Sequence, residues 1–111
     1  INVKDMIRAS NFLLGKHDFT SFRAVGCQAK SPIKTLSKIS ITKKKNIITI
    51  SFTARSFLYN QVRIMSGTLK DVGTGLVKPI DLKNIINAKN RSKAGSTAPA
   101  KGLTLLKVNY K

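Results

Sequence analysis

The spacing of apolar residues changes abruptly in the middle of the chain, and this change constrains the fold more than any other feature. From Ile48 to Ala54, apolar residues alternate with Thr and Ser, which is typical of a half-buried β-strand. From Leu58 to Val72, apolar residues recur at steps of four and three, which predicts a helix with one buried side. A chain that contains both patterns so close together is expected to pack helices against a sheet.

The same patterns predict the remaining elements. We expect helices over residues 2–15, from about Phe57 to Val72 and from Pro79 onward, strands over Leu36–Thr42, residues 48–54 and Leu103–Tyr110, a lysine-rich turn at residues 43–46, and loops over residues 16–34 and 90–102. This order predicts a single α+β domain over residues 1–111, with an antiparallel β-sheet and helices packed on one face.

The charge balance points to a polyanionic partner. The chain has 21 Lys and Arg against four acidic residues, all of them Asp, and a formal net charge of +17. Such an excess attracts nucleic acid, which is therefore the first partner to consider. The alternative is that the lysines reflect genomic composition and form a solvated surface. A membrane surface is a weaker alternative, because no expected helix combines a basic face with large aromatic anchors.

Few residues are suited to metal binding or self-sufficient catalysis. Cys27 and His17 are the only soft ligands, too few for a structural zinc site, and a single cysteine excludes an internal disulfide. The pair His17-Asp18 could be catalytic, but in a loop such a pair is more often a turn device. No apolar run is long enough to cross a membrane, and the chain begins at Ile1 without Met, which suggests a piece of a longer protein.

Basic residues beside aromatic ones or at strand ends are candidates for RNA contact. Arg23 lies in a loop with Phe19 and Phe22, Arg55 ends a strand, and Lys43, Lys44 and Lys45 form the turn. Cationic groups at such positions can reach phosphates, and loop aromatics can stack on unpaired bases. Alternatively, the lysines are only a solvated turn and the two Phe are core anchors.

Arg63 lies beside the apolar stripe of the long helix and not opposite it. Its helical neighbours are Tyr59, Ser66, Gly67 and Lys70, a polar face that contains two very small residues. The two small residues predict a depression where another molecule could approach closely. The alternative is an ordinary solvated arginine.

Three stretches of the chain resemble, in the right order, motifs of the tRNA pseudouridine synthase A family. They are L-L-G-K-H-D-F-T-S-F-R at residues 13–23, A-R-S-F-L-Y-N-Q-V-R-I-M-S-G-T-L-K-D-V-G-T-G at residues 54–75, and R-S-K-A-G-S-T-A-P-A-K-G-L-T-L at residues 91–105. The third matches the family signature R-x-x-A-G-x-T-A-P-A-x-G-L-x-L. One departure is Asn90, where the family pattern has an acidic residue that would give Arg91 a local partner.

The resemblance implies that the chain is the C-terminal half of a pseudouridine synthase fold. It implies cofactor-free isomerisation of uridine to pseudouridine in the anticodon stem-loop of tRNA, by a cytoplasmic homodimer. The family's N-terminal half carries the catalytic Asp in a motif of the type R-T-D-x-G-V-H-A, which this chain does not contain. This chain alone is therefore expected to be inactive.

The resemblance also assigns roles to individual residues. Arg63 matches the arginine that ion-pairs with the catalytic Asp of the other half, and Leu103 matches the apolar residue that packs on the target pyrimidine. We expect RNA contacts from Arg23, Lys43, Lys44, Lys45, Arg55, Arg91 and Lys93. The alternatives are a non-catalytic RNA-binding module that kept the fold, and a structural domain whose charge is compositional.

Overall fold

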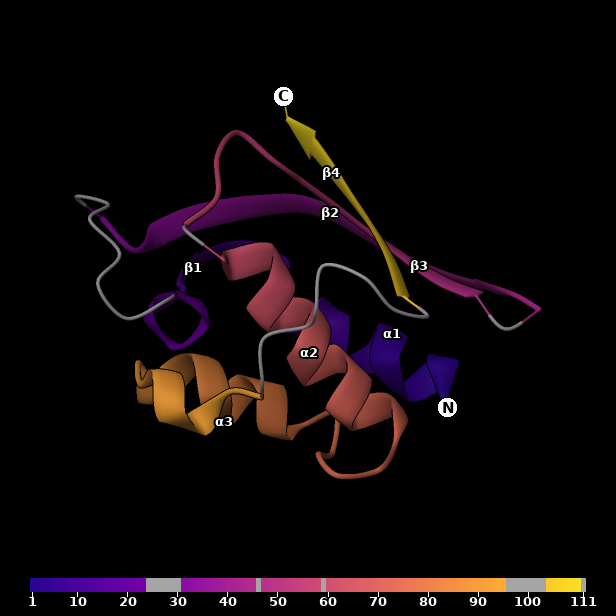
Figure 1. The fold of residues 1–111 in the computed structure, drawn as a ribbon. Helices are drawn as coiled ribbons and strands as arrows, with labels where there is room; N and C mark the ends of the chain where they lie inside the picture. Colours follow the sequence, from indigo (N-terminus) through magenta and orange to yellow (C-terminus); the bar gives the residue numbers. More distant parts are fainter. Residues whose placement is uncertain (24–30, 46, 59, 96–103, 111) are drawn as a thin grey trace.

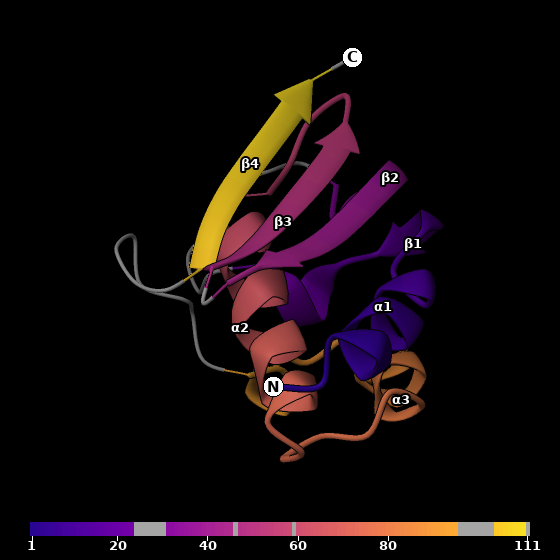
Figure 2. The same ribbon diagram turned by 90° about the vertical axis from the view of Figure 1, so that its right-hand side faces the viewer.

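Helices cover one face of a four-stranded sheet. The computed structural model describes residues 1–23, 31–45, 47–58, 60–95 and 104–110. Helices α1 (Val3–Asn11), α2 (Gln61–Gly73) and α3 (Asp81–Ala88) pack on one face of strands β1 (Gly15–Asp18), β2 (Ile33–Lys44), β3 (Ile47–Ala54) and β4 (Thr104–Tyr110) (Figure 1, Figure 2). Two 3₁₀ helices, η1 (Thr20–Phe22) and η2 (Arg91–Lys93), complete the described structure. The predicted α+β class is confirmed.

The sheet has the order β1-β2-β3-β4 and is not wholly antiparallel. The pairs β1–β2 and β2–β3 are antiparallel as predicted, but β4 runs parallel to β3, with Thr104 opposite Ile48 and Tyr110 opposite Ala54. The expectation for the last strand was therefore wrong. Strands β3 and β4 are joined through α2 and α3. This crossover returns the chain to the end of the sheet where β3 begins, so that β4 runs in the same direction as β3.

Strand β1 begins at Gly15, the expected end of the first helix, and otherwise lies within the stretch that was expected to be a loop. It pairs with the start of β2, from Gly15 opposite Leu36 to Asp18 opposite Ile33. A strand of only four residues is too short to show a period in the sequence, so the pattern could not reveal it. Its pairing also explains why β2 begins at Ile33, before the predicted start at Leu36.

The core confirms the predicted apolar faces. Leu58, Met65, Leu69 and Val72 are buried, and Val62 is partly buried against them. The aromatic residues Phe19, Phe22 and Phe52 are fully buried, and the rings of the first two lie 6.3 Å apart. Phe19 and Phe22 are therefore core anchors and not surface platforms for bases. Among the described helices, none is long and apolar enough to cross a membrane.

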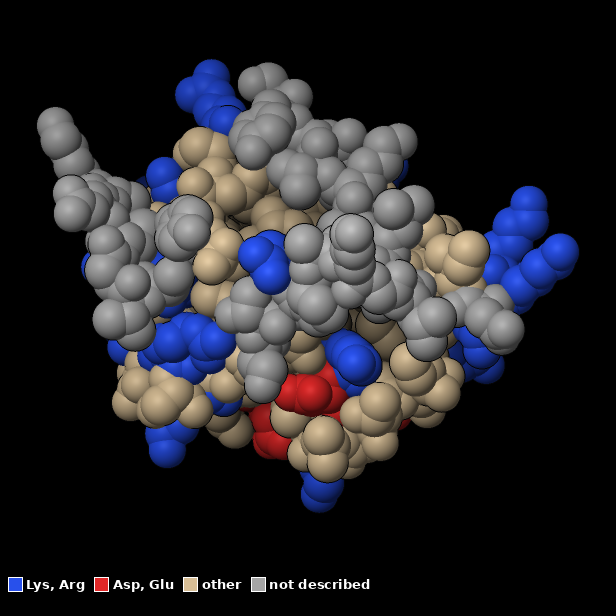
Figure 3. Space-filling model, viewed as in Figure 1, with Lys and Arg blue, Asp and Glu red and all other residues tan. Residues whose placement is uncertain are grey.

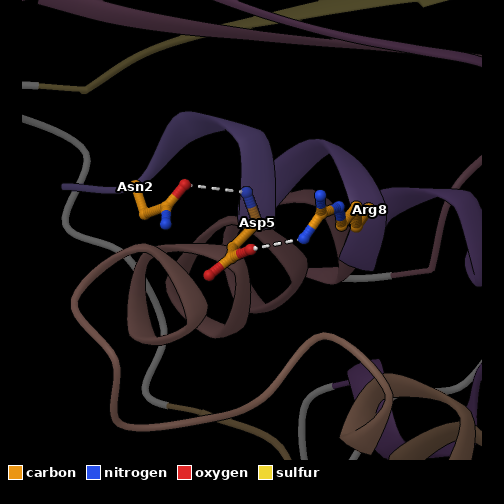
Figure 4. Close-up of polar contacts among 3 residues, drawn as sticks. All are labelled: Asn2, Asp5 and Arg8. Carbon is orange, nitrogen blue, oxygen red and sulfur yellow. Dashed lines mark hydrogen bonds and ion pairs between the residues drawn. The ribbon is translucent and has the colours of Figure 1, made fainter.

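Helix α1 begins with a side-chain cap. The Asn2 side chain accepts a hydrogen bond from the Asp5 N–H at 3.0 Å, and Arg8 lies 3.3 Å from the Asp5 carboxylate (Figure 4). Both interactions are exposed, so the ion pair contributes only a few tenths of a kcal/mol. The helix ends at Asn11, before the predicted stop at Gly15.

Helices α1 and α2 approach closely at Gly73. A Cβ atom there would lie 2.8 Å from Met6 Sδ and 2.9 Å from Ile1 Cγ2, and the Gly73 carbonyl accepts the Asn2 N–H at 2.8 Å. Gly73 is the last residue of α2. It also allows the two helices to pack at this distance.

Helix α2 begins at Gln61 and not at Phe57 as predicted, because the chain bends just before it. Asn60 has a left-handed backbone, with φ of 59°. The side-chain oxygen of the fully buried Gln61 accepts the Leu58 N–H at 2.8 Å, which fixes this bend. As a result, Arg63 lies in the first turn of α2 and not in the second.

Candidate nucleic-acid interface

Arg63 is half-buried in the first turn of α2, at the end of the helix that follows directly from β3. The N-terminus of a helix carries a partial positive charge, so the guanidinium and the helix end together favour an anion at this place. Ser66 and Gly67 are both buried, and the Ser66 hydroxyl donates to the Val62 carbonyl at 2.8 Å. Neither residue therefore lies on an exposed polar face of the helix.

The segment after η2 is fastened to α2 one turn beyond Arg63. The Gly95 N–H donates to Thr68 Oγ1 at 2.9 Å, and that hydroxyl donates to the Ile64 carbonyl at 2.9 Å. Gly95 lies so close to α2 that a Cβ would be 3.0 Å from Thr68 Cα and in direct contact with the Asp71 carboxylate. Only glycine fits there without a shift of the helix or the segment.

Arg91 and Asn90 shape the same segment. Arg91 Nη1 donates to the Gly95 carbonyl at 2.9 Å, so the arginine has a local partner although position 90 is not acidic. The Asn90 side-chain oxygen accepts the Ser92 N–H at 3.0 Å and the Ser92 hydroxyl at 2.8 Å, which caps η2. An acidic residue at position 90 would offer a carboxylate oxygen as the same acceptor. Asn90 therefore caps η2 as an acidic residue would.

A buried hydroxyl joins η1 to the region around η2. Ser21 is fully buried, donates to the Ile85 carbonyl at 2.6 Å and accepts the Asn90 N–H at 2.9 Å. Ser21 belongs to the first of the three sequence motifs, and Asn90 directly precedes the third. Together with the Gly95–Thr68 bond, this contact brings all three motifs to α2 and its neighbours.

Asp18 organises the chain between β1 and η1. Its carboxylate accepts the Thr20 N–H at 2.9 Å and the Thr20 hydroxyl at 2.6 Å, and His17 Nε2 lies 2.7 Å from the Leu14 carbonyl oxygen. Burial raises the pKa of the Asp18 carboxyl, but the two Thr20 hydrogen bonds and the charges of Lys89 and Arg23 outweigh it, so the pKa lies below its ordinary value. The geometry supports the turn device and not a catalytic pair.

The predicted RNA-contacting residues fall at two ends of the sheet. Arg23 and Arg55 lie at the end where β2 begins, and Arg91 and Lys93 follow nearby because η2 packs against η1. Lys43, Lys44 and Lys45 are exposed at the far end of β2, whose 12 residues span roughly 36 Å. Basic side chains project there from the margin of the molecule, and acidic ones occupy a small area in the lower part of the same face (Figure 3). Leu103 and Cys27 lie outside the described residues.

Three further lysines lie near these residues but left no signal in the sequence. Lys89 beside Asp18, and Lys16 and Lys34 on the paired strands β1 and β2, were not singled out, because the short strand that aligns the last two left no pattern. The buried Ser21 could not be told from any loop serine. Among the described residues, no group of three or more His, Cys, Asp or Glu could hold a metal ion.

Known proteins resemble nearly the whole chain. Residues 9–111 match the family described as tRNA pseudouridine synthase. Proteins named tRNA pseudouridine synthase A are 53% identical in Orientia tsutsugamushi (strain Ikeda), 50% in Ehrlichia ruminantium (strain Welgevonden) and 46% in Buchnera aphidicola subsp. Acyrthosiphon pisum (strain Tuc7). Each match covers 99% of this chain and, in the same order, 39%, 45% and 41% of the relative. The chain thus spans about two-fifths of the length of these curated relatives.

The junction between α2 and the segment after η2 can be tested by Gly95→Ala. The added Cβ would press on the backbone of Thr68, which cannot yield cheaply, so we expect a loss of about 1–3 kcal/mol in the free energy of unfolding. Thr68→Val removes the acceptor for the Gly95 N–H without changing the size of the side chain, so it should also lower the free energy of unfolding. Urea denaturation measures both. Thr74→Val, an exposed threonine at the end of the same helix, is the control. If Gly95→Ala and Thr68→Val both had the stability of the parent, the junction would contribute nothing to the stability of the fold.

The Asp18 turn should make stability depend on pH. A carboxyl whose folded pKa lies below its unfolded value stabilises the fold above the unfolded pKa, and this contribution is lost as the pH falls through the folded pKa. Asp18→Asn keeps an oxygen acceptor but removes the charge. Its stability should therefore be lower than that of the parent at about pH 7, and the difference should shrink below about pH 4.

The measurement for Asp18 is urea denaturation of the parent and Asp18→Asn across that pH range. Thr20→Val removes the hydroxyl donor, which should raise the folded pKa of Asp18 and weaken the pH dependence. A difference between parent and Asp18→Asn that stays constant from neutral to acidic pH would contradict this account.

Proposed function

Because the chain belongs to the tRNA pseudouridine synthase family, we propose that it forms the C-terminal half of an enzyme that converts uridine to pseudouridine in the anticodon stem-loop of tRNA. In this proposal the catalytic Asp comes from an N-terminal half, and the active-site cleft lies between the two halves. The full-length protein is the chain that contains both halves. The reaction needs no cofactor, and the enzyme works in the cytoplasm as a homodimer. The observation that carries the proposal is the convergence of the three family motifs around α2, the helix that holds Arg63: η1 packs against α2, and the segment after η2 is bonded to it through Gly95 and Thr68.

Arg63 would hold the catalytic carboxylate in its charged form. A guanidinium within hydrogen-bond distance lowers the pKa of a carboxyl and can bind both of its oxygens, which fixes its orientation. The position of Arg63 supports this role, because the first turn of α2 adds the positive end of the helix dipole. The half-buried setting of the residue also strengthens its charge interactions relative to those in open water.

The chemistry itself requires access to a base that is normally stacked. The enzyme must turn the uridine out of the RNA, break its glycosidic bond, rotate the base and rejoin it through carbon. Extrusion costs a few kcal/mol, which contacts to the RNA backbone must offset. The excess of 21 basic over four acidic residues supports that task, since the four Asp can neutralise at most four cations. Leu103 would pack on the target pyrimidine.

The experiment that tests the proposal compares pseudouridine formation in uridine-containing tRNA by the full-length protein and its Arg63→Ala variant. Loss of the guanidinium should lower kcat on the order of 100-fold or more, as when a preorganised electrostatic partner is removed. Arg63→Lys keeps the charge but not the two-pronged geometry, so it should recover only part of the rate.

Arg8→Ala is the matched control, because Arg8 is an exposed arginine of α1 whose partner is Asp5. Thermal melting shows that each variant is folded. Full activity of Arg63→Ala would remove the proposed role of this residue. Tight tRNA binding by a parent that forms no pseudouridine would instead favour a non-catalytic RNA-binding module.

A further inference from the structure

A groove of about 380 Å³ lies where β1, the start of β2 and the end of β3 meet. It is lined by three cations from three separate segments, Lys16, Lys34 and Arg55, together with Ile33, Ala54 and Ser56. We call it the β1–β2 groove. Arg55 is exposed and Lys34 is half-buried, so the groove combines accessible charge with a partly enclosed floor.

The groove contains no negative charge of its own. All four acidic residues of the chain lie in the described part, and none of them lines the groove. Asp18 is the nearest acidic residue by strand register, opposite Ile33, but its carboxylate is engaged by Thr20. Three cations gathered without a counter-charge repel one another, so an anion bound between them relieves that repulsion.

One of the three cations of the groove has a neutral hydrogen-bond partner. Lys34 Nζ donates to the Ser56 hydroxyl at 3.1 Å, which fixes the ammonium near the groove and leaves its full charge unneutralised. A β-bulge in β2 between Leu36 and Lys38 turns Ser37 toward the same groove, where its hydroxyl donates to the Thr53 carbonyl at 3.1 Å. The bulge bends the start of β2 and thereby shapes this wall of the groove.

We propose that the β1–β2 groove binds the phosphate backbone of the tRNA substrate, with Lys16, Lys34 and Arg55 as the phosphate contacts. The inference rests on the proposed function for the identity of the RNA. Arg55 directly follows β3 and stands on the segment that leads into α2, so backbone held here is positioned by the same segment that positions Arg63. The groove positions the RNA and takes no part in the chemical steps.

The test is tRNA binding by the full-length protein with the double substitution Lys16→Gln/Lys34→Gln. Two lost phosphate contacts should raise Kd roughly tenfold at about 0.1 M salt and reduce the slope of log K against log salt by about 1 for each lysine. Pseudouridine formation at saturating tRNA should keep the parent kcat, while the KM for tRNA should rise with Kd.

Two matched variants make the result specific. Lys4→Gln/Lys83→Gln removes the same charge from exposed lysines of α1 and α3, and it should leave the Kd close to that of the parent. Lys16→Arg/Lys34→Arg keeps the charge in the groove and should also bind like the parent. Thermal melting of all three double variants shows that they are folded.

Three outcomes overturn the proposal. In the first, Lys16→Gln/Lys34→Gln and Lys4→Gln/Lys83→Gln have the same Kd and salt slope. In the second, the groove variant changes the oligomeric state by light scattering while tRNA affinity stays the same, which would make the groove a protein contact. In the third, the parent does not bind tRNA at all. Failure of the proposed activity gives a different result, because a parent that forms no pseudouridine would still show the groove-specific loss of tRNA binding.

Discussion

The hydroxyl of Thr68 makes two hydrogen bonds on which the arrangement of the site depends. It donates to the Ile64 carbonyl within α2 and accepts the Gly95 N–H from the segment after η2. The close approach of Gly95 to the helix backbone makes this contact possible, and a side chain at that position would separate the two segments. Through Ser21 and Asn90, η1 is bonded to the residues just before the same segment. Three stretches that are distant in the sequence are therefore positioned around one helix by a few polar bonds.

The charge of the chain limits what this arrangement can bind. With 21 basic and four acidic residues, the fold carries a net repulsion that a bound anionic partner relieves. The four Asp are largely used to build local structure. Asp18 closes a turn with Thr20, Asp5 lies in the first turn of α1, and Asp81 accepts the Lys78 N–H at 3.1 Å. The basic surface is thus left available for a polyanion.

Much of the fold could be predicted from periodicity, because long amphipathic segments leave a strong pattern. The β2–β3 hairpin and the buried stripe of α2 follow directly from residues 36–72. Very short elements, single-residue bends and the direction of the last strand could not be predicted from periodicity. Strand β1 has four residues and no visible period, the left-handed Asn60 moves the start of α2, and the parallel direction of β4 depends on the path of two helices.

The site was predictable only in part, for a physical reason. The motifs single out Arg63 and the segment after Arg91, but burial depends on neighbours that are distant in the sequence, so Ser66 and Gly67 could not be recognised as buried. Lys16 and Lys34 share a groove only because β1 pairs with β2. Such proximity arises from tertiary pairing, which no local pattern records.

In the proposed enzyme, Arg63 meets a catalytic carboxylate supplied by the N-terminal half. A crystal structure of the full-length protein measures this directly. We expect an Asp carboxylate of that half within about 2.7–2.9 Å of the Arg63 guanidinium, the distance of a charge-assisted hydrogen bond. An Arg63 side chain that contacts only water or its own half of the chain would contradict it.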